Sequence, residues 1–125
     1  MSHYRRLTPH FSYREMTQTD TGIPNVPDDY AFHNLYHTCR HLEAIRSKCG
    51  FPLPVSSGYR SAEVNTRLRE LGYEASEHSY HLDGRAVDIV TSHLSEYDKE
   101  KLYTAVDSQF PSEFIIKPNL IHIAF

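Results

Sequence analysis

The chain carries the stretch SYHLDGRAVD at residues 79–88 and ends with LIHIAF at residues 120–125. Two histidines and one aspartate within these stretches are candidate metal ligands, namely His81, Asp88 and His122. Two neutral imidazoles and one carboxylate form a common ligand set of catalytic zinc, because three protein ligands leave the fourth tetrahedral position open for water. We therefore predict a Zn²⁺ site made of these three residues. An open zinc site in turn indicates hydrolysis.

The alternation of side chains along a strand supports this prediction. Residues 85–90 are expected to form a strand that places Val87 and Ile89 on its apolar face and Asp88 on the other. In the last strand, His122 likewise lies opposite the apolar face. An aspartate in so apolar a segment is costly unless a cation or strong hydrogen bonds accompany it, and zinc would supply the charge.

Each candidate ligand also has a structural explanation when it is taken alone. A strand histidine such as His122 is more often a hydrogen-bonded residue than a metal ligand. Asp88 alone fits an ion pair with Arg60 or Arg85, and His81 alone fits a loop residue. The combination of suitable ligand types on one expected cleft face favours the metal site, although no short motif such as HExxH is present.

Length and charge limit the fold and the partners. The 125 residues suit a single domain with one modest core. A net charge of -3 gives no basic footprint, so we expect no nucleic acid partner. We expect no membrane partner, because no apolar run approaches the roughly 20 residues of a spanning helix. Residues 1–10 lack the apolar core of a signal peptide, so we expect synthesis in the cytoplasm. We also expect a monomer.

The order of apolar patterns and breakers predicts an α+β fold, a small antiparallel sheet flanked by helices. Residues 1–27 are expected to form an irregular lead with a helical turn near residues 12–17. The other expected elements are a helix from Asp28 or Asp29 to Lys48, a strand within residues 52–58, a helix from Ser61 to Gly72, a strand at 85–90, a helix at 95–109 and a hairpin of strands at 113–117 and 120–125. The residues expected to face the core include Phe32, Leu35, Cys39 and Leu42 on the first helix and Val64, Leu68 and Leu71 on the second.

Two cysteines and three histidines lie in or beside the first long helix. Cys39 and Cys49 are separated by about 15 Å of helical rise, too far for a disulfide, so we expect free thiols and a core position for Cys39. The histidines recur every fourth residue, a spacing compatible with metal binding, but they lie opposite the apolar stripe. We therefore favour a solvated face for His33, His37 and His41.

Residues 79–88 match SxHxxGxAxD at every defined position, and this pattern resembles the signature of the M15-type D-alanyl-D-alanine metallopeptidases and their hedgehog-like relatives. The sequence SGYRS at residues 57–61 resembles the turn that the family carries upstream. Residues 7–27 resemble the N-terminal lead of its short phage and prophage members. The resemblance covers nearly the whole chain, and it implies a hedgehog/DD-peptidase fold with residues 1–125 as a single M15-like peptidase domain.

The resemblance also implies roles for individual residues. The two histidines and the aspartate of the candidate site would bind zinc. Arg60 would steady the substrate carbonyl or the developing oxyanion, and Ser79 would support substrate binding through hydrogen bonds. A guanidinium suits that task because it stays charged and holds an oxyanion with two hydrogen bonds. The structural alternative for Arg60 is an ion pair with Asp88 or Glu63.

At one position the chain departs from the family. Active members carry a carboxylate a few residues before the last zinc-binding histidine, where it takes a proton from water, and here that position falls on Lys117 or Asn119. Loss of this base would cost about 10²–10⁴-fold in rate. The candidate replacements are Glu113, which is closest in sequence, Glu77 and Asp83. Lys117 would oppose catalysis unless it binds a substrate carboxylate.

Two functions are consistent with these residues. The first is a zinc-dependent peptidase that cleaves the stem peptides of bacterial peptidoglycan, of either endopeptidase or carboxypeptidase type, with delivery to the cell wall by a phage. The second is a module of the same fold that is catalytically impaired and only binds zinc, peptidoglycan peptides or another protein. The missing carboxylate favours the second function, and a carboxylate close to the candidate zinc site would favour the first.

Overall fold

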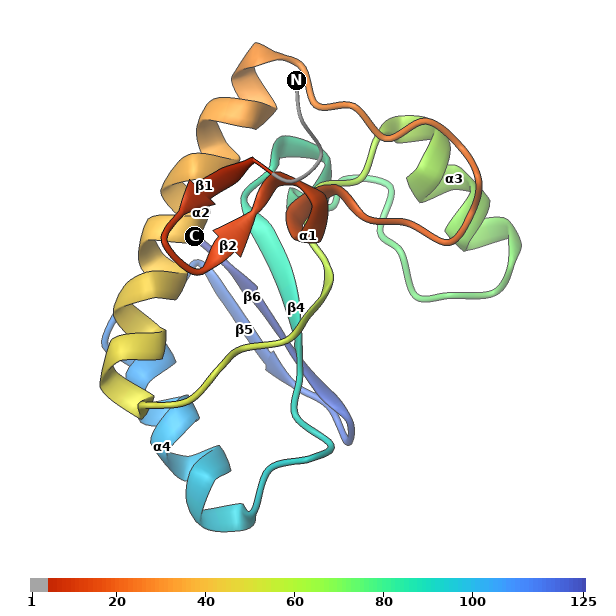
Figure 1. The fold of residues 1–125 in the computed structure, drawn as a ribbon. Coiled ribbons are helices and arrows are strands. Elements are labelled where there is room, and N and C mark those ends of the chain that lie inside the picture. The colour runs from red at the N-terminus through yellow and green to blue at the C-terminus, as the bar shows by residue number, and fades with distance from the viewer. Residues whose placement is uncertain (1–4) are drawn as a thin grey trace.

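The structure is a computed structural model that describes residues 5–125, so the first four residues of the expected lead lie outside it. It confirms the α+β fold (Figure 1). In chain order the elements are β1 (Arg6–Thr8), β2 (Phe11–Ser12), α1 (Tyr13–Thr17), α2 (Asp29–Cys49), β3 (Val55–Ser57), α3 (Ala62–Glu70), the 3-10 helix η1 (Tyr80–Asp83), β4 (Ala86–Val90), α4 (Glu96–Asp107), β5 (Glu113–Ile116) and β6 (Leu120–Ala124).

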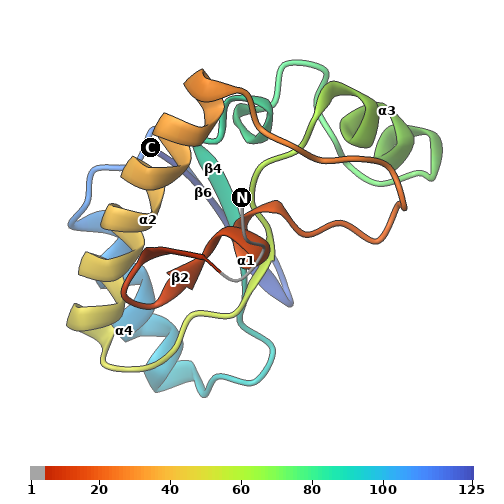
Figure 2. The same cartoon turned by 45° about the horizontal axis from the view of Figure 1, so that its top comes forward.

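Four antiparallel strands form the main sheet in the order β3-β4-β6-β5. Helices α2 and α4 pack together on one side of β4, and α3 lies on the other side, away from α2 (Figures 1 and 2). Strands β4 and β6 pair residue for residue, so that Val87 lies opposite Ile123 and Asp88 lies opposite His122. This register puts the apolar residues of both strands on one face and the two polar residues on the other.

The core forms where α2 and α4 cover the apolar face of the sheet. Its members from these elements include Leu35, Cys39, Leu42, Ile45, Val87, Ile89, Leu102, Val106, Ile121 and Ile123. Both cysteines are free, as expected; Cys39 is buried in the core as predicted, and Cys49 is buried as well. Burial raises the pKa of the Cys39 thiol to about 12, with the charges of Glu43 and Glu15 adding to the effect, so this thiol is unreactive at neutral pH.

Side-chain caps explain where the helices begin and end. Asp28 accepts a hydrogen bond from the backbone N–H of Ala31 at the start of α2, and Gly50 ends this helix with a left-handed backbone. Ser61 and Ser95 cap α3 and α4 in the same way as Asp28 caps α2. These residues are the reason that the boundaries expected from the sequence lie within a few positions of the observed ones.

Three expectations about the fold need correction, two about packing and one about the N-terminal lead. Leu71 is expected to face the core, but it is 51% exposed, because α3 ends at Glu70 and the chain turns outward. Phe32 is only partly buried, and its neighbour Ala31 takes the buried place on α2. The N-terminal lead is more regular than expected, since β1 and β2 pair before α1 begins.

The three histidines of α2 do not form one surface. His33 and His37 are exposed and touch each other through their Nε2 atoms, 3.2 Å apart. The ring of His41 is partly buried and stacks on Phe125, with 4.3 Å between the ring centroids. The solvated face therefore describes the first two histidines only. Within residues 5–125, every helix is too short or too polar to span a membrane.

Candidate metal centre

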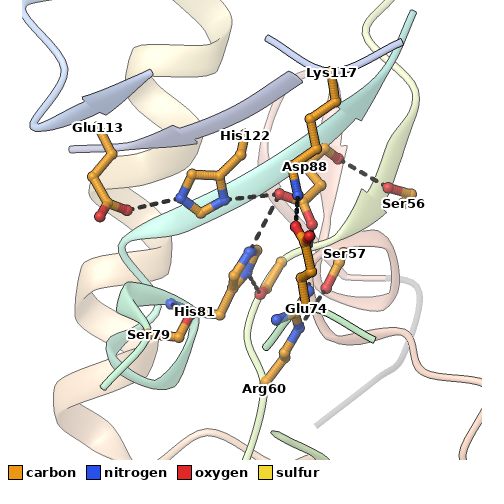
Figure 3. A network of polar contacts seen from close by, with 11 residues as sticks. Ser56, Ser57, Arg60, Glu74, Ser79, His81, Asp88, Glu113, Lys117 and His122 are labelled. Carbon is orange, nitrogen blue, oxygen red and sulfur yellow. Dashed lines mark hydrogen bonds and ion pairs between the residues drawn. The ribbon is translucent and has the colours of Figure 1, made fainter. Parts of the chain in front are cut away.

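Three side chains from separate elements meet beside the sheet, His81 from η1, Asp88 from β4 and His122 from β6 (Figure 3). Asp88 Oδ1 lies 3.0 Å from Nδ1 of His122 and 3.3 Å from Nε2 of His81. One possible ligand atom from each of the three residues lies within 4.8 Å of the others. These distances are consistent with a metal site of two imidazoles and one carboxylate.

The loop around η1 fixes His81. Ser79 caps η1, and its Oγ accepts a hydrogen bond of 3.1 Å from the backbone N–H of His81. Gly84 ends η1 with a positive φ of 74°, and the chain then enters β4. The ring donates from Nδ1 to the carbonyl oxygen of Gly58 over 2.6 Å. This bond places the proton on Nδ1 and leaves the Nε2 lone pair toward Asp88.

Burial and hydrogen bonds give the three groups different charges. Burial lowers the pKa of His81, and this effect exceeds the opposite one of Asp88. Burial alone would raise the pKa of Asp88, but the contacts with His122 and His81 outweigh it and hold this pKa well below its usual range. Burial alone would lower the pKa of His122, but its contacts with Asp88 and Glu113 outweigh it, so the pKa of His122 rises.

This charge pattern fits a cation at the centre of the cluster. The neutral ring of His81 turns an unprotonated nitrogen toward an ionised carboxylate oxygen 3.3 Å away. Two lone pairs at that distance repel each other, and a divalent cation between them would turn the repulsion into coordination. The donor set of two nitrogens and one oxygen suits Zn²⁺.

Arg60 lies beside the cluster and is itself mostly buried. Its Nη2 lies 3.3 Å from Asp88 Oδ2, and its Nε donates to Ser57 Oγ over 3.1 Å. Burial lowers the pKa of Arg60, and the charge of Asp88 works against this shift. The structural alternative of a pair with Asp88 is thus present, and the guanidinium also stands at the edge of the candidate site.

The two hairpin residues singled out from the sequence lie at different places. Glu113 Oε1 is 2.8 Å from Nε2 of His122, on the side of the ring that faces away from Asp88 (Figure 3). Lys117 Nζ is 3.2 Å from Oε2 of Glu74, a residue of the loop between α3 and η1. Sequence reasoning misses Glu74, because this residue lies in a loop without a recognisable pattern.

Two cavities with volumes of about 640 Å³ and about 430 Å³ lie side by side at Asp88. Both are lined by Arg60, Glu74, Ala75, Asp88 and Lys117. The larger one continues along α3, where its lining includes Val64, Leu68, Leu71, Tyr73 and Leu120. The smaller one contains Ser79 and Ile115 besides both histidines of the cluster. The smaller cavity therefore contains the candidate metal site, and the larger one adjoins it at Asp88. Of the other two carboxylates considered from the sequence, Glu77 is exposed and Asp83 is partly buried in η1, and neither lines these cavities.

A solved structure and a known family resemble this chain, whereas none of the curated proteins matches its sequence. Among solved structures, the L-Ala D-Glu endopeptidase ChiX of Serratia marcescens is similar, with a TM-score of 0.53 and 18% identity, over 86% of this chain and 95% of that chain. This likeness confirms the fold expected for an M15-type peptidase. Residues 9–124 match the family described as Peptidase M15. The chain therefore belongs to the peptidase M15 family.

Proposed function

We propose that the protein is a zinc-dependent peptidase that cleaves stem peptides of bacterial peptidoglycan. The observation that carries this proposal is the cluster of His81, Asp88 and His122 inside a cleft, in a chain of the peptidase M15 family. The similar structure from Serratia marcescens belongs to an endopeptidase that is named for a bond between L-Ala and D-Glu. That name supports a peptidoglycan peptide as the substrate class.

The cluster would hold zinc through Nε2 of His81, a carboxylate oxygen of Asp88 and Nδ1 of His122. When bound there, zinc supplies a Lewis acid that activates water and polarises a carbonyl group. Arg60 stabilises the negative charge that develops on the carbonyl oxygen, because its guanidinium is fixed at the edge of the cluster by Ser57 and Asp88. Ser79 contributes by fixing the loop that carries His81.

Glu74 is the carboxylate that best fits the role of general base. It lines both cavities together with Asp88, and Lys117 holds it by an ion pair of 3.2 Å. Lys117 stands near the position where the family carries its own carboxylate, so this pair brings a carboxylate back to that region. Glu74 would take a proton from the attacking water and give it to the leaving amine nitrogen as the C–N bond breaks. In this arrangement Lys117 holds the base, and its role in binding a substrate carboxylate stays a prediction.

The cleft favours an endopeptidase over a carboxypeptidase. A carboxypeptidase needs a cleft that is closed beyond the last residue of its substrate, whereas here the cavity that contains the cluster adjoins a second cavity along α3. This second cavity would accept further substrate residues beyond those at the metal site. Delivery to the wall by a phage stays a prediction that rests on resemblance to the short family members.

The alternative is a module that binds zinc and peptide without cleaving it. The observation in its favour is that the position of the carboxylate of active members falls on Lys117 or Asn119 in this chain. The deciding experiment incubates the zinc-loaded protein with purified peptidoglycan and with soluble muropeptides, and identifies the products by mass spectrometry. Cleavage that disappears in His81→Ala supports the peptidase. Zinc and muropeptide binding without products would favour the alternative, and absence of zinc binding would exclude both.

A further inference from the structure

Each histidine of the cluster has one inner nitrogen that faces Asp88 and one outer nitrogen that is bound elsewhere. For His81 the outer nitrogen is Nδ1, which donates to the main-chain carbonyl of Gly58. For His122 the outer nitrogen is Nε2, which lies 2.8 Å from Oε1 of Glu113. The Glu113 carboxylate thus binds the outer nitrogen of His122, as the Gly58 carbonyl binds the outer nitrogen of His81.

The strand register explains why Glu113 reaches this nitrogen. In the pairing of β5 with β6, Ile115 lies directly opposite His122, and Glu113 lies opposite Ala124. Glu113 and Ile115 are two residues apart, so they share the sheet face of His122. Glu113 is then a diagonal neighbour of His122, a distance that a long side chain spans easily. The contact therefore depends on the main-chain pairing as well as on the rotamer of Glu113.

The geometry points to Glu113 as a positioning residue that fixes the ring of His122 for metal binding. The carboxylate holds the proton on Nε2, so the lone pair of Nδ1 faces the centre of the cluster. Its negative charge also makes the imidazole a stronger ligand. This inference rests on the proposed function, because it assigns Glu113 to the same metal site.

Glu113 does not lie where a general base must lie. A base must reach the water at the open position of the metal, on the inner side of both rings. Oε1 of Glu113 instead binds the outer nitrogen of His122, and the ring lies between this oxygen and Asp88 (Figure 3). Glu113 and Glu74 therefore have separate tasks in the same cleft, the first on a ligand and the second on the reacting proton.

The test measures the zinc dissociation constant by competition with a chromophoric chelator, without any substrate. Glu113→Ala should bind zinc about 10–100-fold more weakly than the wild type, the range typical of lost outer partners of metal ligands. Glu113→Gln keeps an acceptor oxygen but loses the charge, so its affinity should lie between the two. Glu100→Gln removes an exposed carboxylate from α4, on a surface away from the cluster, and should leave the affinity unchanged.

A second measurement follows the His122 ring itself by NMR. In the zinc-loaded wild type, the Nε2 proton of His122 should exchange slowly because Glu113 accepts it, and this signal should vanish in Glu113→Ala. Wild-type zinc affinity together with an unchanged Nε2 proton signal in Glu113→Ala would overturn the inference. This outcome would count equally if the wild type binds zinc but cleaves no peptide. A wild type that binds no zinc would overturn the inference together with the proposed function. Circular dichroism of the metal-free variants checks that each one is folded.

Discussion

His81 and His122 present the same group to the same carboxylate, yet the protein holds them by different means. The His81 side chain is 2% exposed and is bound by a main-chain carbonyl. The His122 side chain is 14% exposed and lies between two carboxylates, Asp88 and Glu113. Their pKa values accordingly move in opposite directions, down for His81 and up for His122.

The difference shows which changes can disturb each ligand. The outer nitrogen of His81 is bound by the main-chain carbonyl of Gly58, so a side-chain substitution does not remove that partner. His122 stands on a regular strand of the sheet, and the outer nitrogen of its ring is bound by a removable side chain, that of Glu113. The first ligand is therefore sensitive to glycine replacements, and the second is sensitive to changes of charge.

The largest expected effect is the loss of the metal when either ring is removed. His81→Ala and His122→Ala should each reduce zinc binding by more than the roughly 10–100-fold expected for an outer partner, because each removes one of only three ligands. Metal content after dialysis, measured by mass spectrometry, checks this. A full zinc equivalent in either variant would contradict the assigned ligand set.

The same two variants should differ in stability when no metal is present. His81→Ala leaves a cavity and an unpaired Gly58 carbonyl, and it should lower the free energy of unfolding by about 2–4 kcal/mol. His122→Ala removes a more exposed ring, with an expected loss of about 1–2 kcal/mol. Urea unfolding in the presence of a chelator measures both values. Equal losses would mean that the difference in burial has no energetic consequence.

The next effect concerns turnover and separates Glu74 from Glu113. Glu74→Gln should lower kcat of the zinc-loaded protein by about 10²–10⁴-fold, the usual contribution of a general base, with unchanged zinc affinity. Lys117→Gln should have a smaller effect, because the carboxylate is still present. Steady-state cleavage of a muropeptide, with zinc affinity measured in parallel, is the test. Wild-type kcat in Glu74→Gln would exclude Glu74 as the base.

The sequence is sufficient to place two of the proposed ligands relative to the sheet. Asp88 and His122 alternate with buried apolar residues along their strands, and this alternation by itself assigns them to one face. Their direct pairing across β4 and β6 needs the structure, because register between distant strands leaves no local signal. The M15 signature likewise leads to the correct family, because its defined positions include two residues of the cluster, His81 and Asp88.

The contacts of Glu113 and Glu74 at the candidate site are beyond sequence reasoning. Glu113 is a candidate base because it is near His122 in the sequence, but its contact follows from the turn of the hairpin, which sends it to the outer nitrogen. Glu74 belongs to a loop, and the pair with Lys117 spans 43 positions of the chain. Helical spacing predicts Leu71 in the core, but the helix ends before that spacing applies.

A glycine replacement tests the main-chain support of His81. Gly84 has a φ of 74°, and an added Cβ would lie 2.4 Å from the carbonyl oxygen of Ala31, so Gly84→Ala should cost about 2–4 kcal/mol. Gly72 has a φ of 90° with nothing within 4 Å of an added Cβ, so Gly72→Ala should cost only the backbone strain, about 1 kcal/mol. Thermal unfolding of both variants measures the difference. Similar losses would show that strain alone matters and that the close approach to α2 does not.

The smallest effect comes from an imidazole–carboxylate pair outside the cluster. His10 donates its backbone N–H to Glu43 over 2.7 Å, and its Nδ1 lies 2.6 Å from the same carboxylate. Burial alone would raise the pKa of Glu43, but these bonds outweigh it and lower the pKa below the ordinary value of 4.5. A lowered pKa in the folded state stabilises the protein above the unfolded value, and this contribution is lost as the pH falls through the folded value.

The expected contribution of Glu43 is below about 1 kcal/mol, because the pair lies near the surface. Between pH 6 and pH 3, roughly the span around an ordinary glutamate pKa, the metal-free wild type should lose slightly more stability than Glu43→Gln. Urea unfolding at several pH values measures this difference. Parallel pH profiles would mean that the Glu43 carboxylate has the same pKa in the folded and unfolded states. An imidazole–carboxylate contact would then need burial like that of His122 before it contributes to stability.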